Sequence, residues 1–200
     1  MSKHSAAIAL LVTILALGIS YIGAFDRLTW FLESLPVLIG IPILVLSHKR
    51  FPLSSLLYGL LAFHAIVLLV GAHYTYARVP LFDWIGASCG WGRNNYDKFA
   101  HFIQGFIPAI LVREVLIRTS PLKGNRWLPP LVVSTCLAIS AAYELFEWLV
   151  AEALGISADD FLGMQGYIWD TQTDMTMALV GAIMALIILS RYHDRSIANI

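Results

Sequence analysis

Long apolar stretches separated by short polar segments dominate this chain. Six of them approach the about 20 residues that an α-helix needs to cross a bilayer, and they cover residues 5–25, 29–47, 51–72, 96–118, 127–153 and 169–190. Because every backbone N–H and C=O group in lipid needs a partner within the protein, we expect each stretch to be a helix. The pattern predicts an all-α fold, a polytopic transmembrane helical bundle of about six helices, in a single domain over residues 1–200.

The composition agrees with a chain that is dissolved in lipid. Of its residues, 58% are hydrophobic and 13% are charged, whereas soluble domains carry about 25% charged residues. The formal net charge of zero offers no basic surface to nucleic acid. We therefore expect membrane lipid as the partner, and no nucleic acid. Cys89 and Cys136 make neither a disulfide framework nor a paired-thiolate metal motif.

Basic residues in the short loops predict the orientation in the membrane. The first stretch has Lys3 and His4 before it but a weak cleavage site, so we interpret it as an uncleaved signal anchor. With the N-terminus inside, eight basic residues lie on the cytoplasmic side and four lie on or near the other. This imbalance predicts that both termini are cytoplasmic. The acidic 154–169 loop, with Asp159 and Asp160, is then outside.

Three of the predicted helices carry two ionisable residues at helical spacing near one end. The pairs are Asp97 with His101, Glu144 with Glu147, and Asp170 with Asp174. Spacings of three or four residues put both members of a pair on one helical face. Each pair therefore presents its two side chains in a common direction.

Depth in the bilayer brings the three pairs together. Glu144 is sixteen residues beyond Leu128, which is about 24 Å along a helix and close to the far edge of a hydrocarbon core about 30 Å thick. The helices that carry the other two pairs begin at that same edge. The sequence thus predicts one polar layer near the periplasmic face, with Glu33 and His73 at a similar height.

Carboxylates crowded in one layer need cations, protons or water. Carboxylates with an imidazole are ligands of Mg²⁺, Mn²⁺ or Zn²⁺. We therefore predict a divalent metal cofactor, with these candidate ligands: Asp97, His101, Glu144, Glu147, Asp170 and Asp174. His101, Glu144 and Glu147 are also candidate catalytic groups, because a glutamate or a histidine can move a proton. Further candidates for ligand contacts are His73, Arg78, Arg93, Lys98, Gln165 and Gln172.

A purely structural interpretation of the layer stays open. Acidic residues in a first helical turn favour the helix dipole, which could explain Asp97, Asp170 and also Asp174. Glu144 and Glu147 lie near a helix C-terminus, where the dipole disfavours them, but they could pair with Arg93 or Lys98.

Four segments resemble the YjdF family of bacterial inner-membrane proteins: HYTYARVP at 73–80, RNNYDKFAHFIQGFIPA at 93–109, SAAYELFEW at 140–148 and FLGMQGYIWDTQTDM at 161–175. The likeness covers most of the chain from about residue 30 onward. It implies a multi-pass protein of the bacterial inner membrane and a helical bundle, but no reaction. A weaker likeness links Asp97, His101 and the acidic fifth and sixth helices to VanZ-like proteins. Glu147 stands where that pattern has a glutamine.

Three functions follow as hypotheses. The first is a metal-dependent enzyme acting on a lipid or lipid-linked phosphate at the polar layer. The second is a proton- or cation-coupled transporter or flippase. Against transport, only Arg113 and Glu114 face the other side, and we expect both to snorkel toward the interface. The third is a structural membrane protein whose polar layer holds helices together.

Overall fold

The computed structural model describes residues 2–155 and 165–200. Six helices in these ranges are long and apolar enough to cross a membrane. They are α1 (Ser2–Tyr21), α2 (Arg27–Ser47), α3 (Ser55–Tyr74), α5 (Tyr96–Thr119), α6 (Leu128–Leu154) and α8 (Asp170–Ile197). A shorter helix, α4 (Pro80–Cys89), lies in the predicted 73–95 connector. The predicted all-α bundle with six spans is confirmed.

Three helix ends differ from the predicted boundaries by four residues or more. Helix α1 ends at Tyr21 and not at Phe25, and Gly23 follows in a left-handed conformation with φ of 72°. Helix α3 begins at Ser55, because Pro52 restricts the residue before it and donates no hydrogen bond. Helix α8 continues to Ile197, seven residues beyond the predicted end at Ser190, since its polar last turns pack against α5.

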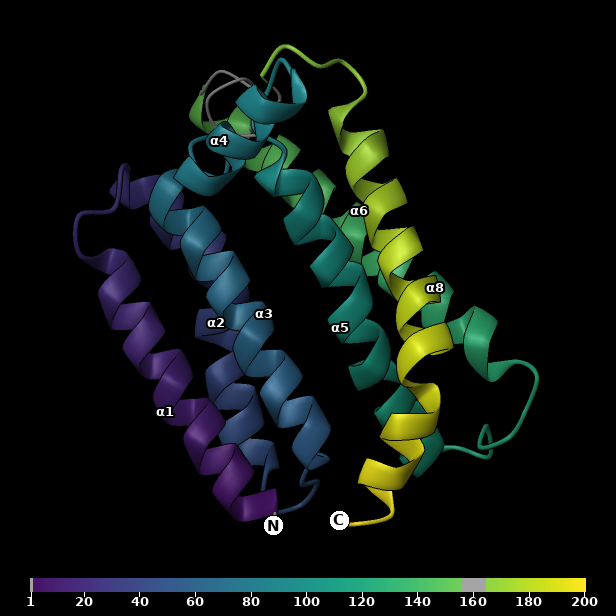
Figure 1. Cartoon of the computed structure of the whole chain (residues 1–200). Helices are drawn as coiled ribbons and strands as arrows, with labels where there is room; N and C mark the ends of the chain where they lie inside the picture. The colour runs from purple at the N-terminus through teal and green to yellow at the C-terminus, as the bar shows by residue number, and fades with distance from the viewer. Residues whose placement is uncertain (1, 156–164) are drawn as a thin grey trace.

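The six long helices form two groups of three (Figure 1). Helices α1 and α2 both pack on α3, while α5, α6 and α8 pack on one another, and contacts between α3 and α5 join the groups. Both chain termini lie at one end of the bundle, and α4 lies at the other. We call these the terminal end and the site end. That the terminal end faces the cytoplasm stays a prediction.

The closest helix packing joins α5 to α8 and depends on small residues. A Cβ atom added at Gly105 would collide with the backbone carbonyl of Ala178, and one at Gly181 would collide with the backbone of Phe102. The alanines of α8 on this face are fully buried: Ala178, Ala182 and Ala185. Small residues let membrane helices approach closely and pack well. This contact brings the first turns of α5 and α8, which carry the polar pairs, side by side.

A second polar group, the terminal-end cluster, holds the opposite ends of the same helices together. Its ionisable members are Arg113, Glu114, Arg118, His193 and Asp194. The Glu114 carboxylate accepts hydrogen bonds from the backbone N–H of Ser54 and from Arg118, each at 2.9 Å, and lies 2.9 Å from His193 Nε2. Arg113 pairs with Asp194 at 2.7 Å.

The prediction that Arg113 and Glu114 snorkel is therefore wrong. Glu114 is completely buried and Arg113 is 8% exposed, because their partners come from α3 and α8. Glu114 contacts two elements that lie about 60 and 79 residues away in sequence. The local pattern of apolar and polar residues does not predict contacts between residues that are so far apart in sequence.

Substitution of Gly105 tests the α5–α8 packing. Gly105→Ala should lower the free energy of unfolding by about 1–3 kcal/mol or more, because the added methyl group meets the backbone and not a flexible side chain. Gly59→Ala is the matched control, since Gly59 is exposed on α3 and an added Cβ meets no atom within 4 Å. Unfolding in detergent, followed by circular dichroism, measures both. Equal stability of the two variants would contradict this packing.

Candidate functional site

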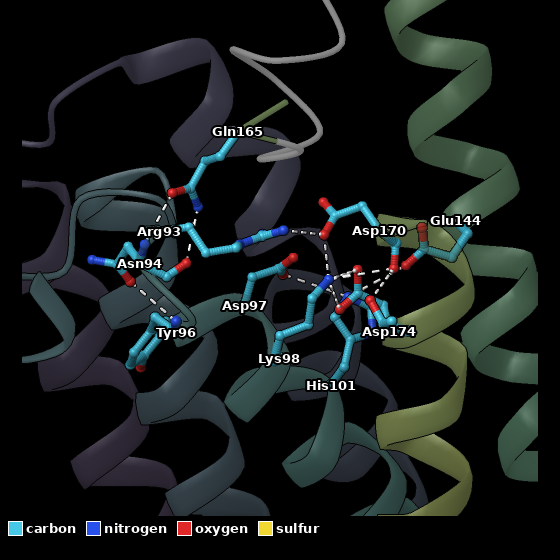
Figure 2. A network of polar contacts seen from close by, with 11 residues as sticks. Arg93, Asn94, Tyr96, Asp97, Lys98, His101, Glu144, Gln165, Asp170 and Asp174 are labelled. Atoms are coloured by element: carbon cyan, nitrogen blue, oxygen red, sulfur yellow. Dashed lines mark hydrogen bonds and ion pairs between the residues drawn. The ribbon is translucent and has the colours of Figure 1, made fainter. Parts of the chain in front are cut away.

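Six carboxylates at the site end form what we call the carboxylate layer: Glu33, Asp97, Glu144, Glu147, Asp170 and Asp174. Each of them is no more than 9% exposed. Helix α5 contributes Asp97, and α8 contributes Asp170 and Asp174 from its first turns. Figure 2 shows these three side chains converging with Glu144 of α6 around Lys98 and His101. The predicted convergence of the three helical pairs is thus present for five of the six residues, and Glu147 lines a cavity together with Glu33 of α2.

Lys98 and Arg93 neutralise the α8 side of the carboxylate layer. The Lys98 ammonium donates hydrogen bonds to both carboxylate oxygens of Asp174, at 2.8 and 2.7 Å, and pairs with Asp170 as well. Arg93 donates to the same Asp170 at 2.7 Å. Asp170 is therefore held by two cations and has the character of a structural residue.

Asp97 and His101 lie within the carboxylate layer, and Asp97 forms no ion pair with a lysine or arginine among the described residues. His101 Nε2 lies 3.5 Å from Asp97 Oδ1 and 3.4 Å from Glu144 Oε1. One potential ligand atom from each of Asp97, His101 and Asp174 lies within 4.8 Å of the other two. We call these three residues the metal triad. Its spacing suits a single cation that all three could reach, with Glu144 beside it.

Buried polar atoms at this centre lack hydrogen bonds. His101 Nδ1, Glu144 Oε1 and Asp170 Oδ2 have no hydrogen-bond partner among the residues that the structure describes. An unsatisfied buried polar group costs about 1–3 kcal/mol. Three such atoms close to the metal triad indicate a place where an ion, water or a ligand completes the contacts.

The charge balance of the carboxylate layer differs from that of the terminal-end cluster. The layer has six carboxylates, and one lysine, one arginine and one histidine pair with them within the described ranges. Residues 156–164, which lie outside those ranges, contain no basic residue. The terminal-end cluster instead sets two carboxylates against two arginines and a histidine. Within the described ranges, carboxyl groups therefore outnumber their lysine, arginine and histidine partners in the carboxylate layer and not in the terminal-end cluster.

Glu33 and Glu147 form a second acidic centre on the wall of a cavity that Asp97 also lines. The Tyr143 hydroxyl donates to Glu33 Oε2 at 2.9 Å. Tyr143 and Glu147 are four residues apart on α6 and so share a face. Sequence analysis placed Glu33 at this height but missed Tyr143, because an isolated tyrosine near a helix end is ordinary in a membrane protein.

A cavity of about 680 Å³ leads away from this acidic centre between the two helix groups. Glu33, Asp97, His101 and Glu147 line it toward the site end, and His48 and Tyr58 line it toward the terminal end. Most of the wall between them is apolar and comes from α1, α2, α3 and α5. The cavity therefore connects the carboxylate layer to an apolar space within the membrane thickness.

Asn94 fixes the start of α5 and thereby the position of Asp97. Its side-chain amide donates to the backbone carbonyl of Val79 and to Asp83, at 3.0 and 2.7 Å, and its side-chain oxygen accepts from the N–H of Tyr96. Gln165 makes two hydrogen bonds with the Asn94 backbone, at 3.0 and 2.9 Å. Sequence analysis missed Asn94, since the pattern along the chain does not reveal which distant groups it joins.

The remaining predicted contact residues lie around the carboxylate layer. His73 Nδ1 lies 2.8 Å from the Ser20 carbonyl and so joins α3 to α1. The Arg78 guanidinium lies over the Phe25 ring, 4.1 Å from its centroid. Gln172 is exposed. A ligand role for these three residues stays a prediction. Asp159 and Asp160, which we used to place the 154–169 loop outside, lie outside the described residues.

Comparison with known proteins identifies the family. A family model described as "Predicted membrane protein (DUF2238)" matches residues 5–195. This chain belongs to the DUF2238 family. It is 46% identical over 198 residues to the inner membrane protein YjdF of Escherichia coli (strain K12), which covers 97% of this chain and 91% of that protein. The resemblance to the YjdF family and the multi-pass inner-membrane location are confirmed.

The DUF2238 comparison does not extend to the VanZ-like proteins, so that weaker likeness stays a prediction. No solved structure matches this DUF2238 chain.

Two aspartates of the carboxylate layer should differ in their effect on stability. Asp170→Asn removes a charge that Arg93 and Lys98 both contact, so it should lower the free energy of unfolding by about 3 kcal/mol. Asp97→Asn removes one of several repelling carboxylates and one 3.5 Å contact with His101. It should leave the stability within about 1 kcal/mol of the parent or raise it.

Unfolding of both variants in detergent with EDTA measures this difference. If Asp97→Asn is as destabilised as Asp170→Asn, Asp97 has a structural role and does not coordinate an ion.

Proposed function

We propose that the carboxylate layer of this inner-membrane protein binds a divalent metal ion through Asp97, His101 and Asp174. The ion would serve a reaction on a lipid or lipid-linked phosphate. The observation that carries the proposal is that three potential ligand atoms lie within 4.8 Å of one another, in a layer whose carboxyl groups outnumber their cationic partners among the described residues. Two carboxylates and an imidazole suit Mn²⁺ or Zn²⁺, and carboxylates also suit Mg²⁺.

Bound there, a divalent ion would polarise a phosphoryl or ester oxygen and lower the pKa of a bound water. Glu144 is the candidate to move a proton, since its Oε1 lies 3.4 Å from His101 Nε2 and makes no hydrogen bond. Lys98 would share Asp174 with the ion, and Lys98 and Arg93 would offer positive charge to a phosphate. Arg78, packed on Phe25, is less well placed for this role.

A lipid substrate is supported by the surroundings of the metal triad. Asp97 and His101 line the mainly apolar cavity between the helix groups. A water-soluble substrate would gain nothing from such a wall, whereas an apolar chain would bury its surface there.

Transport is the second candidate, and one observation favours it. The cavity is lined by residues from the site end to His48 and Tyr58 near the terminal end, a route that an amphiphile could follow. The expectation that Arg113 and Glu114 are the only polar groups on that side is wrong, since Arg118, His193 and Asp194 pair with them. The charges of this terminal-end cluster are balanced and bonded to one another, so they make a poor relay for a proton or cation.

Metal analysis of the purified protein tests the proposal. Protein prepared in a mild detergent should contain about one equivalent of Mn²⁺, Zn²⁺ or Mg²⁺ by elemental mass spectrometry. Asp174→Asn should weaken the affinity at least about 100-fold, because it removes a direct ligand. Asp194→Asn is the matched control, since that aspartate belongs to the terminal-end cluster and is largely exposed.

Loss of metal in Asp174→Asn alone supports the site. No metal in the parent, or equal metal in both variants, contradicts it and favours a protonated carboxylate layer.

A further inference from the structure

Glu33 and Glu147 remain unexplained by the metal triad. Glu33 is 4% exposed and Glu147 is 9% exposed, and both line the cavity. Glu33 accepts a hydrogen bond from the neutral hydroxyl of Tyr143. Glu147 makes no hydrogen bond or ion pair with any residue that the structure describes. A carboxyl group buried to this extent must be protonated or meet a cation, and a positively charged ligand would supply that cation.

The cavity beside Glu33 and Glu147 defines the rest of that ligand. Its volume of about 680 Å³ falls within the about 300–1,000 Å³ of typical small-molecule sites. Its wall consists mainly of alanine, leucine, isoleucine and valine side chains, including Ala6, Leu10, Val37, Ile41 and Leu68. An apolar space of this size within the membrane gains dispersion contacts when a hydrocarbon chain fills it.

We infer that the cavity binds a membrane lipid with an ammonium group in its headgroup. One hydrocarbon chain lies along α2 and α3, and the ammonium group lies between Glu33 and Glu147. The Tyr143 hydroxyl holds Glu33 toward this group. This inference deepens the proposed function, because it names the substrate class that the carboxylate layer would receive. A phosphate in the same headgroup would then lie toward Asp97 and His101, which line the cavity beside the two glutamates.

The inference concerns a lipid and not a free amine or a metal ion. A free amine would satisfy the two glutamates but leave the apolar wall unused. A second metal ion at Glu33 and Glu147 would also leave that wall unused, and the group of potential metal ligands found in the described ranges consists of Asp97, His101 and Asp174. A lipid with an ammonium group satisfies both parts of the cavity.

Native mass spectrometry with two lipids tests the headgroup. Palmitoyl-oleoyl phosphatidylethanolamine and palmitoyl-oleoyl phosphatidylglycerol carry the same chains, but only the first has an ammonium group. Delipidated protein in a maltoside detergent should bind the ethanolamine lipid about tenfold more tightly, the effect of one charge-assisted hydrogen bond. The Glu33→Gln, Glu147→Gln double variant should lose this preference and still bind both lipids. Equal binding by the parent, or a preference for phosphatidylglycerol, would overturn the inference.

Substitution of Gly40 tests the position of the chain. Gly40 lines the cavity, and an added Cβ meets no atom within 4 Å, so Gly40→Phe should fold with its ring in the cavity. It should reduce the binding of both lipids about tenfold, since a phenyl group then occupies the space of the chain. Gly59→Phe is the matched control, because Gly59 lies on the exposed face of α3 and also has open space. If Gly40→Phe binds both lipids as tightly as the parent, the proposed position of the hydrocarbon chain along α2 and α3 is wrong.

The same measurement in EDTA separates this inference from the proposed function. Selective binding of the ethanolamine lipid should persist without metal, because Glu33 and Glu147 are not members of the metal triad. If the purified protein contains no metal and still prefers the ethanolamine lipid, the lipid site is supported and the proposed metal site is contradicted. Selectivity that vanishes in EDTA would overturn the role of the two glutamates.

Discussion

The cost of burying charge in lipid is the constraint on which this structure depends. A carboxylate at membrane depth must be paired, protonated or coordinated to a cation, and the bundle holds two groups of such residues at opposite ends. At the terminal end, Glu114 is completely buried, yet a backbone N–H, an arginine and a histidine surround it. That arrangement satisfies the constraint internally, as expected of a group that holds helices together.

At the site end the same constraint is not satisfied by side chains. Asp170 has two cationic partners, but Asp97, Glu147 and Glu33 have no ion pair with a lysine or arginine among the described residues. Close packing of α5 on α8 through Gly105 and Gly181 forces Asp97 and Asp174 together despite their repulsion. Proteins commonly keep such unfavourable arrangements where they bind or react with something. The contrast between the two ends is the main argument for a functional site end.

Much of this organisation is visible in the sequence. Apolar length predicts the six spans, and the position of Glu144 within α6 correctly places it level with the first turns of α5 and α8. The terminal-end cluster could not be predicted, because Glu114 and His193 are partners across about 79 residues and His193 lies beyond the apolar part of α8. The pairing of Glu33 with Tyr143 was hidden for the same reason. Periodicity reveals the face and depth of a side chain, but not which distant side chain shares that depth.

The most direct measurement of the central claim is pulsed electron paramagnetic resonance of Mn²⁺ added to EDTA-treated protein. If the metal triad holds the ion, the spectrum will show coupling to an imidazole nitrogen, and this coupling will be absent from His101→Gln. If the parent gives only the spectrum of Mn²⁺ surrounded by water oxygen, the carboxylate layer does not coordinate a metal through His101, and its surplus charge must be met by protons.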